Sequence, residues 1–163
     1  SFNHEFGETF VLPNAKTLAH GAKVPGTDGQ KMSKSYNNTL PLFGDVKSIR
    51  KQIMRIVTDS RAMEDPKDPE EDHLFQLYRL FAEPADIEAM ANKYRNGGFG
   101  YGEVKKAVAD ASEAYFAAAR ARRTELENNL DYVQEVLAQG AQRAREIASG
   151  VVTRAKTACG LTS

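Results

Sequence analysis

Hydrophobic residues in the second part of the chain follow a helical pattern. From Asp45 onward they recur at intervals of three and four residues, which places them on one face of an α-helix. Asp45 and Asp68 are suitable N-cap residues, and Pro69 would then occupy the first position of a second helix. A third helix is predicted from Pro84 to the glycine pair at 97–98. The positions expected to face the core of these three helices are Val46, Ile49, Ile53, Ile56, Val57, Leu74, Phe75, Leu77, Tyr78, Phe81, Ile87, Met90, Ala91 and Tyr94.

Two longer helices are predicted after the glycine pair. Residues 102 to about 127 form an Ala-rich segment, whose hydrophobic stripe consists of Val104, Val108, Ala111, Tyr115 and Ala118. Asp131 and Gln134 have the spacing of a capping box and predict the start of the last helix. Gly140 and Gly150 are expected to interrupt this helix, because glycine lowers helix stability. Its stripe consists of Val133, Val136, Leu137, Ala141, Ala144, Ile147, Ala148, Val151 and Ala155.

The first part of the chain has a different pattern. Residues 8–12 predict one brief strand that ends at Pro13, and residues 23–38 contain Pro-Gly and Asp-Gly pairs that predict a loop. The change near Gly44 divides the chain into segments 1–43 and 44–163. Because one strand cannot bury a sheet, we expect further strands upstream of this chain. The expected fold class is mainly α: a helical bundle preceded by the last strand and loop of an α/β domain.

Composition excludes several classes of protein. The 163 residues include 22 Lys and Arg and 22 Asp and Glu, so the net charge is zero and a generally basic nucleic-acid-binding surface is excluded. The single cysteine, Cys159, excludes an intrachain disulfide and a cysteine-based zinc site. No apolar run approaches the roughly 20 residues that span a bilayer. We expect no signal peptide, no membrane contact and a cytoplasmic location.

Basic residues are concentrated between positions 16 and 55, where eight Lys and Arg residues accompany two Asp residues. This stretch contains Lys31-Met-Ser-Lys-Ser35 in a glycine-flanked loop. Two ammonium groups, two hydroxyls and backbone N–H groups suit a polyphosphate, because charge on departing phosphates needs cations nearby. Lys34 would act as a point charge, and Ser33 and Ser35 as hydrogen-bond donors. From residue types alone, a solvated surface loop is the simpler alternative.

The pentapeptide is the characteristic loop of class I aminoacyl-tRNA synthetases. Its surroundings resemble bacterial tryptophanyl-tRNA synthetases over nearly the whole chain, and the downstream segments favour tryptophan over tyrosine. The resemblance implies that a Rossmann-like catalytic domain ends near residue 43 and that an anticodon-binding helical domain follows it. The segments that carry the resemblance outside the pentapeptide are 2–4, 7–13, 24–30, 36–39, 56–61, 74–78, 102–106 and 140–148.

The resemblance also implies the chemistry. These enzymes form tryptophanyl-adenylate from tryptophan and ATP, with Mg²⁺ accompanying the ATP, and then transfer the amino acid to tRNA(Trp). By resemblance, Lys31 and Lys34 would contact the phosphates, and Lys34 would stabilise the departing pyrophosphate. Val24 would lie near the adenine, and no protein-bound metal is expected. The residues expected to bind ATP are Val24, Lys31, Met32, Ser33, Lys34 and Ser35.

The helical domain of the family binds the tRNA anticodon. Exposed basic residues of the last helices are therefore candidates for contacts with tRNA phosphates or bases. For each of them, an ordinary solvated position is an equal alternative. If several contact phosphates, the affinity for tRNA should fall steeply as the salt concentration rises. The candidates are Arg120, Arg122, Arg123, Arg143 and Arg145.

One element that class I synthetases require is missing from the sequence. None of His4, His20 and His73 stands in a His-x-Gly-His motif. In the family this motif, the tryptophan pocket and most of the dimer interface lie upstream of the corresponding segment. We therefore expect a C-terminal portion of the ligase that is inactive alone, the complete enzyme being a homodimer through parts missing here. The alternatives are a tyrosyl-tRNA synthetase fragment and a stand-alone, synthetase-derived RNA-binding module, although the intact Lys31–Ser35 loop argues against the latter.

Overall fold

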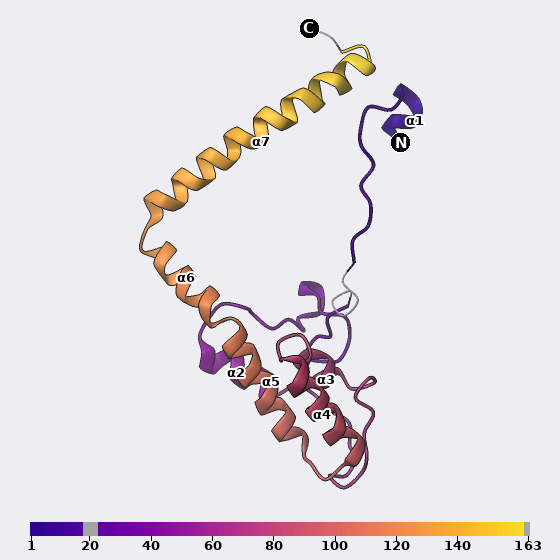
Figure 1. Ribbon diagram of the computed structural model, residues 1–163, viewed down its shortest axis with the longest axis vertical. Helices are drawn as coiled ribbons and strands as arrows, with labels where there is room; N and C mark the ends of the chain where they lie inside the picture. The colour runs from indigo at the N-terminus through magenta and orange to yellow at the C-terminus, as the bar shows by residue number, and fades with distance from the viewer. Residues whose placement is uncertain (18–22, 162–163) are drawn as a thin grey trace. The chain divides into compact units, whose positions relative to one another are not determined.

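A computed structural model describes residues 1–17 and 23–161, and this part of the chain is helical without a named strand (Figure 1). The mainly α fold class is thereby confirmed. Two compact units are present: Thr17–Ala121, and Ser1–Lys16 together with Arg122–Ser163. None of the described helices is long and apolar enough to cross a membrane. The elements are α1 (Phe2–Phe6), the 3₁₀-helix η1 (Lys34–Tyr36), α2 (Val46–Met54), α3 (His73–Tyr78), α4 (Pro84–Asn96), α5 (Tyr101–Tyr115), α6 (Ala117–Glu127) and α7 (Leu130–Ala158).

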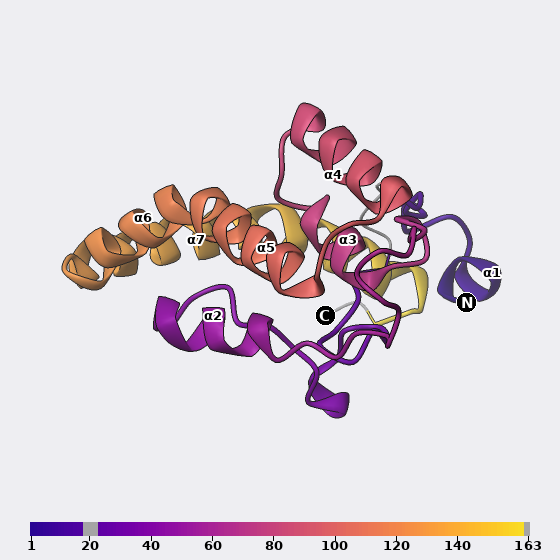
Figure 2. The ribbon, with the colours of Figure 1, turned by 90° about the horizontal axis from the view of Figure 1, so that it is seen from below.

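The hydrophobic core lies in the unit Thr17–Ala121. Helix α5 packs against α2 and α3, and α4 packs against α3 (Figure 2). The Tyr94 ring lies between those of Phe75 and Phe99, with ring centroids 5.4 and 4.8 Å away. Such ring pairs add specific geometry to the hydrophobic burial. The buried residues of the core are Ile49, Ile53, Ile56, Leu74, Phe75, Leu77, Tyr78, Ala91, Tyr94, Phe99, Val104, Val108 and Ala109.

Helix α2 begins where the sequence predicts, and α4 begins and ends where it predicts. The Asp45 carboxylate accepts a hydrogen bond from the Ser48 N–H at 2.8 Å, which caps α2. Gly97 ends α4 with a φ of 71°, and a Cβ at this position would overlap the Glu64 carbonyl, so a glycine is required. Val57, in contrast, is exposed rather than in the core: α2 ends at Met54, and the chain beyond it buries Ile56 but not Val57.

The helix predicted to begin at Pro69, with Asp68 as its N-cap, begins four residues later, at His73. The Asp68 carboxylate accepts from the Glu70 N–H at 2.8 Å and closes a local turn instead of capping a helix. Asp72 is the actual N-cap: its carboxylate accepts from the Phe75 N–H at 2.9 Å and from the buried Tyr94 hydroxyl at 3.0 Å. The contact with Tyr94, which is distant in sequence, favours this later start.

The strand predicted at residues 8–12 is absent from the described structure. The Asn3 side chain donates to the Phe10 carbonyl at 2.7 Å and accepts from the Phe10 N–H at 3.0 Å. The rings of Phe2 and Phe10 also pack at 4.9 Å. Because the backbone groups of Phe10 are already bonded to a side chain, this segment closes a local loop onto α1 rather than forming a strand.

The long helix predicted over residues 102–127 is divided into α5 and α6 at Phe116. Tyr115 and Ala118 are exposed, contrary to the predicted stripe, whereas Ser112 is buried. The Phe116 ring packs against the rings of Phe81 and Tyr115 at 5.7 and 5.0 Å. This cluster of rings surrounds the point where the helix is interrupted.

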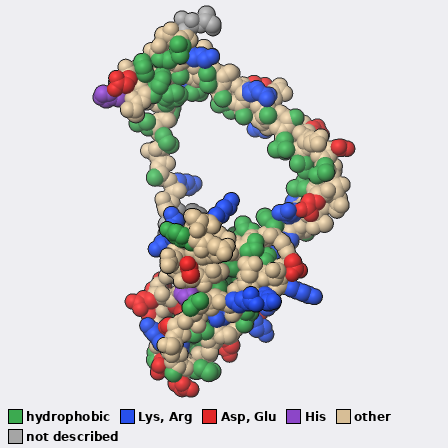
Figure 3. Space-filling model, turned by 180° about the vertical axis from the view of Figure 1, so that it is seen from behind, with side chains coloured by type: hydrophobic (Ala, Val, Ile, Leu, Met, Phe, Trp, Pro, Cys, Tyr) green, Lys and Arg blue, Asp and Glu red, His purple; other side chains and the backbone are tan. Residues whose placement is uncertain are grey.

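Helix α7 is continuous through Gly140 and Gly150, so the predicted interruptions are wrong. Two side-chain hydrogen bonds between residues four positions apart flank Gly140 and support the helix there. Gln139 bonds to Glu135 before the glycine, and Gln142 bonds to Glu146 after it. Its N-cap is Asn129 rather than Asp131. None of its residues is buried within the described structure, and hydrophobic side chains lie exposed along it (Figure 3). The boundary expected near Gly44 stays a prediction.

Candidate functional site

The Lys31–Ser35 segment follows a tight turn. The Gly29 N–H donates to the Gly26 carbonyl at 3.1 Å, and the Gly26 N–H donates to the Gln30 carbonyl at 2.6 Å. Pro25 and Lys31 form an isolated antiparallel bridge. Gly29 has a φ of 79°, which explains the glycine of the Asp-Gly pair. The loop predicted for this region is therefore observed, and it is an ordered turn.

At the end of the pentapeptide, the chain forms the short 3₁₀-helix η1, which extends to Tyr36. The Ser33 hydroxyl accepts from the Ser35 N–H at 3.3 Å and lies 2.7 Å from the Ser35 hydroxyl. Lys31, Lys34 and Ser35 are exposed, whereas Met32 and Ser33 are half-buried. Neither lysine forms an ion pair with any of the described residues. The structure therefore presents two unpaired ammonium groups on an ordered loop, an arrangement that suits an anionic ligand.

Val24 and Met32 connect the two sides of the turn. The Met32 N–H donates to the Val24 carbonyl at 2.8 Å, and Val24 packs against the hydrophobic core. Two of the predicted ATP-binding residues are thus joined directly. The Met32 side chain is half-buried, and its packing role in the loop stays a prediction.

Asn38 is a polar residue of this site that the sequence did not single out. It is only 2% exposed, and its side chain bonds to the backbone of Ser33 and Lys31 and to the Asp28 carboxylate. The hydrogen bond from Asn38 is the main reason that the pKa of Asp28 lies below its usual value; burial opposes the shift and the Gln30 N–H adds to it. The signal in the sequence was the Asn pair at positions 37 and 38, one residue after the pentapeptide.

The turn is also attached to the helices of its own unit. The Val57 N–H donates to the Thr27 carbonyl at 3.3 Å, and the Val57 carbonyl lies 2.7 Å from Nε2 of His73, the first residue of α3. Gly29 contacts the His73 ring closely enough that an added Cβ would be 3.3 Å from Nδ1. The loop and the start of α3 are therefore in direct contact.

The five arginines predicted to bind tRNA lie in different surroundings. Arg120 is half-buried and donates to the Glu113 carbonyl at 3.0 Å. Arg122 and Arg123 on α6 pair with Glu125 and Glu127, both at 2.7 Å. On α7, Arg143 and Arg145 are exposed and form no ion pair with the residues that the structure describes. Their side chains are therefore the most available for phosphate among the five.

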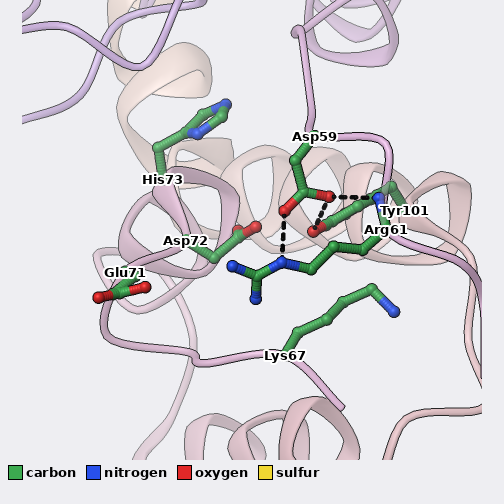
Figure 4. A pocket seen from close by; sticks show the side chains of 7 residues that line it. All are labelled: Asp59, Arg61, Lys67, Glu71, Asp72, His73 and Tyr101. Atoms are coloured by element: carbon green, nitrogen blue, oxygen red, sulfur yellow. Dashed lines mark hydrogen bonds and ion pairs between the residues drawn. The ribbon is translucent and has the colours of Figure 1, made fainter. Parts of the chain in front are cut away.

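A cavity of about 190 Å³ lies among Asp59, Arg61, Lys67, Glu71, Asp72, His73 and Tyr101 (Figure 4). Lys67 is 3% exposed; its ammonium donates to the carbonyls of Ala62 and Asp65, both at 2.9 Å, and lies 4.5 Å from the Phe99 ring centroid. The cavity's charged groups are thus held largely by protein partners, and we assign it no function.

The carboxylate of Asp59 at this cavity is held by two partners. It accepts from the Tyr101 hydroxyl at 2.8 Å and pairs with Arg61 at 3.2 Å. Burial alone would raise the pKa of Asp59, but these hydrogen bonds and charges lower it below its usual value. Within the described residues, no group of three His, Cys, Asp or Glu side chains could hold a metal ion.

The family described as "tRNA synthetases class I (W and Y)" matches residues 1–117 of the 163-residue chain. This chain belongs to that family. The matched residues include the turn, the pentapeptide and helices α2 to α5. The class I assignment made from the pentapeptide is confirmed.

The individual relatives that follow are tryptophan enzymes rather than tyrosine enzymes. The chain is 76% identical over 161 residues to a tryptophan–tRNA ligase of Rhodopirellula baltica, covering 99% of this chain and 50% of the relative. A tryptophan–tRNA ligase of Fusobacterium nucleatum is 44% identical, with 98% and 49% covered. The crystal structure of tryptophanyl-tRNA synthetase from Campylobacter jejuni complexed with ADP and tryptophane superimposes with a TM-score of 0.77 at 42% identity, covering 98% of this chain and 50% of that one.

The resemblance to tryptophanyl-tRNA synthetases is therefore confirmed. The chain spans about half the length of these curated relatives. The roles predicted for individual residues of the pentapeptide and for the arginines stay predictions.

Proposed function

We propose that this chain is the carboxy-terminal part of a tryptophan–tRNA ligase. The observation that supports this best is the 76% identity to such a ligase over 161 residues, which include an intact Lys31–Ser35 loop. In the reaction, the tryptophan carboxylate attacks the α-phosphate of ATP and pyrophosphate leaves. The ribose hydroxyl at the end of tRNA(Trp) then attacks the carbonyl carbon of the adenylate, and AMP leaves.

In this proposal, the Lys31–Ser35 loop stabilises the departing pyrophosphate. Negative charge accumulates on the β- and γ-phosphates as the bond to the α-phosphorus breaks, and a fixed cation lowers the barrier because it interacts more strongly with the developing charge. Lys34 and Lys31 are both exposed and supply this charge. Ser33 and Ser35 donate to phosphate oxygens, Met32 packs the loop and Val24 lies beside the adenine. Mg²⁺ enters with ATP, bound to its phosphates.

The choice of tryptophan over tyrosine is tested with the complete ligase. Purified full-length protein should charge tRNA(Trp) with tryptophan and leave tRNA(Tyr) and tyrosine unused. Acid-gel separation of charged from uncharged tRNA measures this directly. The proposal fails if tyrosine is charged preferentially, and it also fails if the complete protein binds tRNA without charging it with either amino acid.

We further propose that tRNA(Trp) contacts α7 through Arg143 and Arg145. The double variant Arg143→Gln/Arg145→Gln of the complete ligase should reduce the slope of log affinity against log salt by about one to two, because each lost phosphate contact removes about 0.7–0.9. Filter binding of tRNA(Trp) over a salt series measures the slope.

The matched control for this experiment is Arg122→Gln/Arg123→Gln. These two side chains already pair with Glu125 and Glu127, so their removal should change the slope much less. An equal change for both double variants would contradict the assignment to α7.

The complete ligase is proposed to act in the cytoplasm as a homodimer, through parts outside this chain. Sedimentation of the complete protein at micromolar concentration tests the dimer, and a monomer mass would reject it.

A further inference from the structure

We propose that Asn38 is a positioning residue: its side chain fixes the backbone on both sides of Met32 and so holds Lys31 and Lys34 in the arrangement that receives ATP phosphates. This inference rests on the proposed function and adds to it a residue outside the pentapeptide. Asn38 itself is buried, so it acts on the phosphates only through the loop.

The hydrogen bonds of Asn38 connect three parts of the loop. Its Oδ1 accepts from the Ser33 N–H at 2.8 Å, and its Nδ2 donates to the Lys31 carbonyl at 3.2 Å and to the Asp28 carboxylate at 2.8 Å. Its own carbonyl accepts from the Thr27 N–H at 2.9 Å. Both amide hydrogens and the amide oxygen are therefore used, as expected for a buried polar side chain.

The turn is shaped to bring Asn38 this close. A Cβ at Gly26 would overlap the Asn38 side-chain amide and would lie 2.7 Å from the Asn38 carbonyl oxygen, so only glycine allows this approach. Asp28, at the tip of the same turn, accepts both from Asn38 and from the Gln30 N–H at 3.0 Å. The residues before and after the pentapeptide are thus packed as one unit around the Asn38 amide.

The position of the two lysines depends on this backbone. Lys31 and Lys34 are exposed and form no ion pair among the described residues, so no side-chain partner places their ammonium groups. Asn38 bonds to the carbonyl of one lysine and to the N–H of the residue directly before the other. Without these bonds the loop would sample more conformations, and fewer of them would match the phosphates at the transition state.

The test uses tryptophan-dependent ATP–pyrophosphate exchange by the complete ligase. Asn38→Ala should lower kcat at least tenfold and leave the KM for tryptophan within twofold, because the tryptophan pocket is not affected. Asn37→Gly is the matched control: Asn37 is the neighbouring amide, exposed, with a φ of 52° that glycine accepts. This control should stay within twofold of wild type.

A second pair of variants keeps the test decisive if Asn38→Ala does not fold. Asn38→Asp preserves the shape but places a carboxylate against Asp28, and it should lower kcat at least as much. Adding Asp28→Asn restores an amide–carboxylate pair with the roles exchanged, and it should recover part of the rate. Recovery would show that the amide–carboxylate pair between positions 28 and 38, rather than the identity of residue 38 alone, sets the rate.

A spectroscopic measurement on the complete ligase accompanies the kinetics. In Asn38→Ala the pKa of Asp28, followed by carboxyl carbon NMR, should rise toward its ordinary value of 3.8, because the main cause of its depression is removed. If wild-type ligase exchanges pyrophosphate and both Asn38 variants match it in kcat, the inference on Asn38 is overturned while the proposed function stands. If wild-type ligase shows no exchange, the proposed function fails, and this inference fails with it.

Discussion

Replacing Lys34 with alanine in the complete ligase is expected to slow tryptophan-dependent ATP–pyrophosphate exchange by about 10²- to 10³-fold, the effect typical for loss of one group that stabilises transition-state charge. Lys34 is exposed on η1 and forms no ion pair with the described residues, so its ammonium is available to a phosphate. The loss should appear mainly in kcat, because the interaction strengthens as pyrophosphate departs.

The measurement is incorporation of labelled pyrophosphate into ATP at saturating tryptophan. Lys51→Ala is a suitable control, because Lys51 is an exposed lysine on α2, outside the pentapeptide. It should retain exchange within about twofold, as usual for a surface substitution. An unchanged rate for Lys34→Ala would remove Lys34 from the proposed mechanism and leave Lys31 as the only lysine of the loop to consider.

The chain of 163 residues is expected to show no tryptophan-dependent exchange when it is purified by itself. The sequence has no His-x-Gly-His motif, and His73, which contacts the loop, is bonded to the Val57 carbonyl at 2.7 Å. In the proposed mechanism, the loop would supply charge for the leaving group, whereas alignment of the tryptophan carboxylate with the α-phosphate would need the missing motif. Alignment of the two reactants is worth several orders of magnitude in rate.

Enzyme concentration decides the sensitivity of this second experiment. The chain is assayed at micromolar concentration beside the complete ligase at nanomolar concentration. Exchange that requires tryptophan, and that the Lys34→Ala variant of the same chain lacks, would show that the chain is sufficient for adenylate formation. Exchange that Lys34→Ala retains would instead indicate a contaminating ligase.

Local signals predicted much of the helical part correctly. Asp45 predicts the start of α2, and the Pro84 to Gly97 segment combines a helical stripe with a stop; α2 begins, and α4 begins and ends, at these positions. Two of the errors arose where a contact outside the local pattern decided between local options. Tyr94 donates to Asp72 and so favours this N-cap over Asp68, and Asn3 bonds to the backbone of Phe10 in place of a strand. Such contacts have no signal in the local pattern.

The candidate site was predicted only in part. The pentapeptide identified the exposed lysines and the serines, because their residue types carry the chemistry. Asn38 was missed because its contribution depends on burial and on bonds to Asp28 and Lys31, which lie ten and seven residues away. Only the structure shows that Arg122 and Arg143 lie in different environments. The glutamate three positions after Arg122, Glu125, is visible in the sequence, but the ion pair between them is not.

The attachment of the turn to Val57 and His73 has a genetic consequence. The Thr27 carbonyl accepts a hydrogen bond from the N–H of Val57, which directly follows the buried Ile56. The stability of the helical core and that of the loop are therefore thermodynamically linked. A selection for temperature-sensitive alleles would therefore yield substitutions in the core that never touch a nucleotide. Under the proposed function, their cells would fail at high temperature through weak engagement of ATP, and suppressors would arise in either segment.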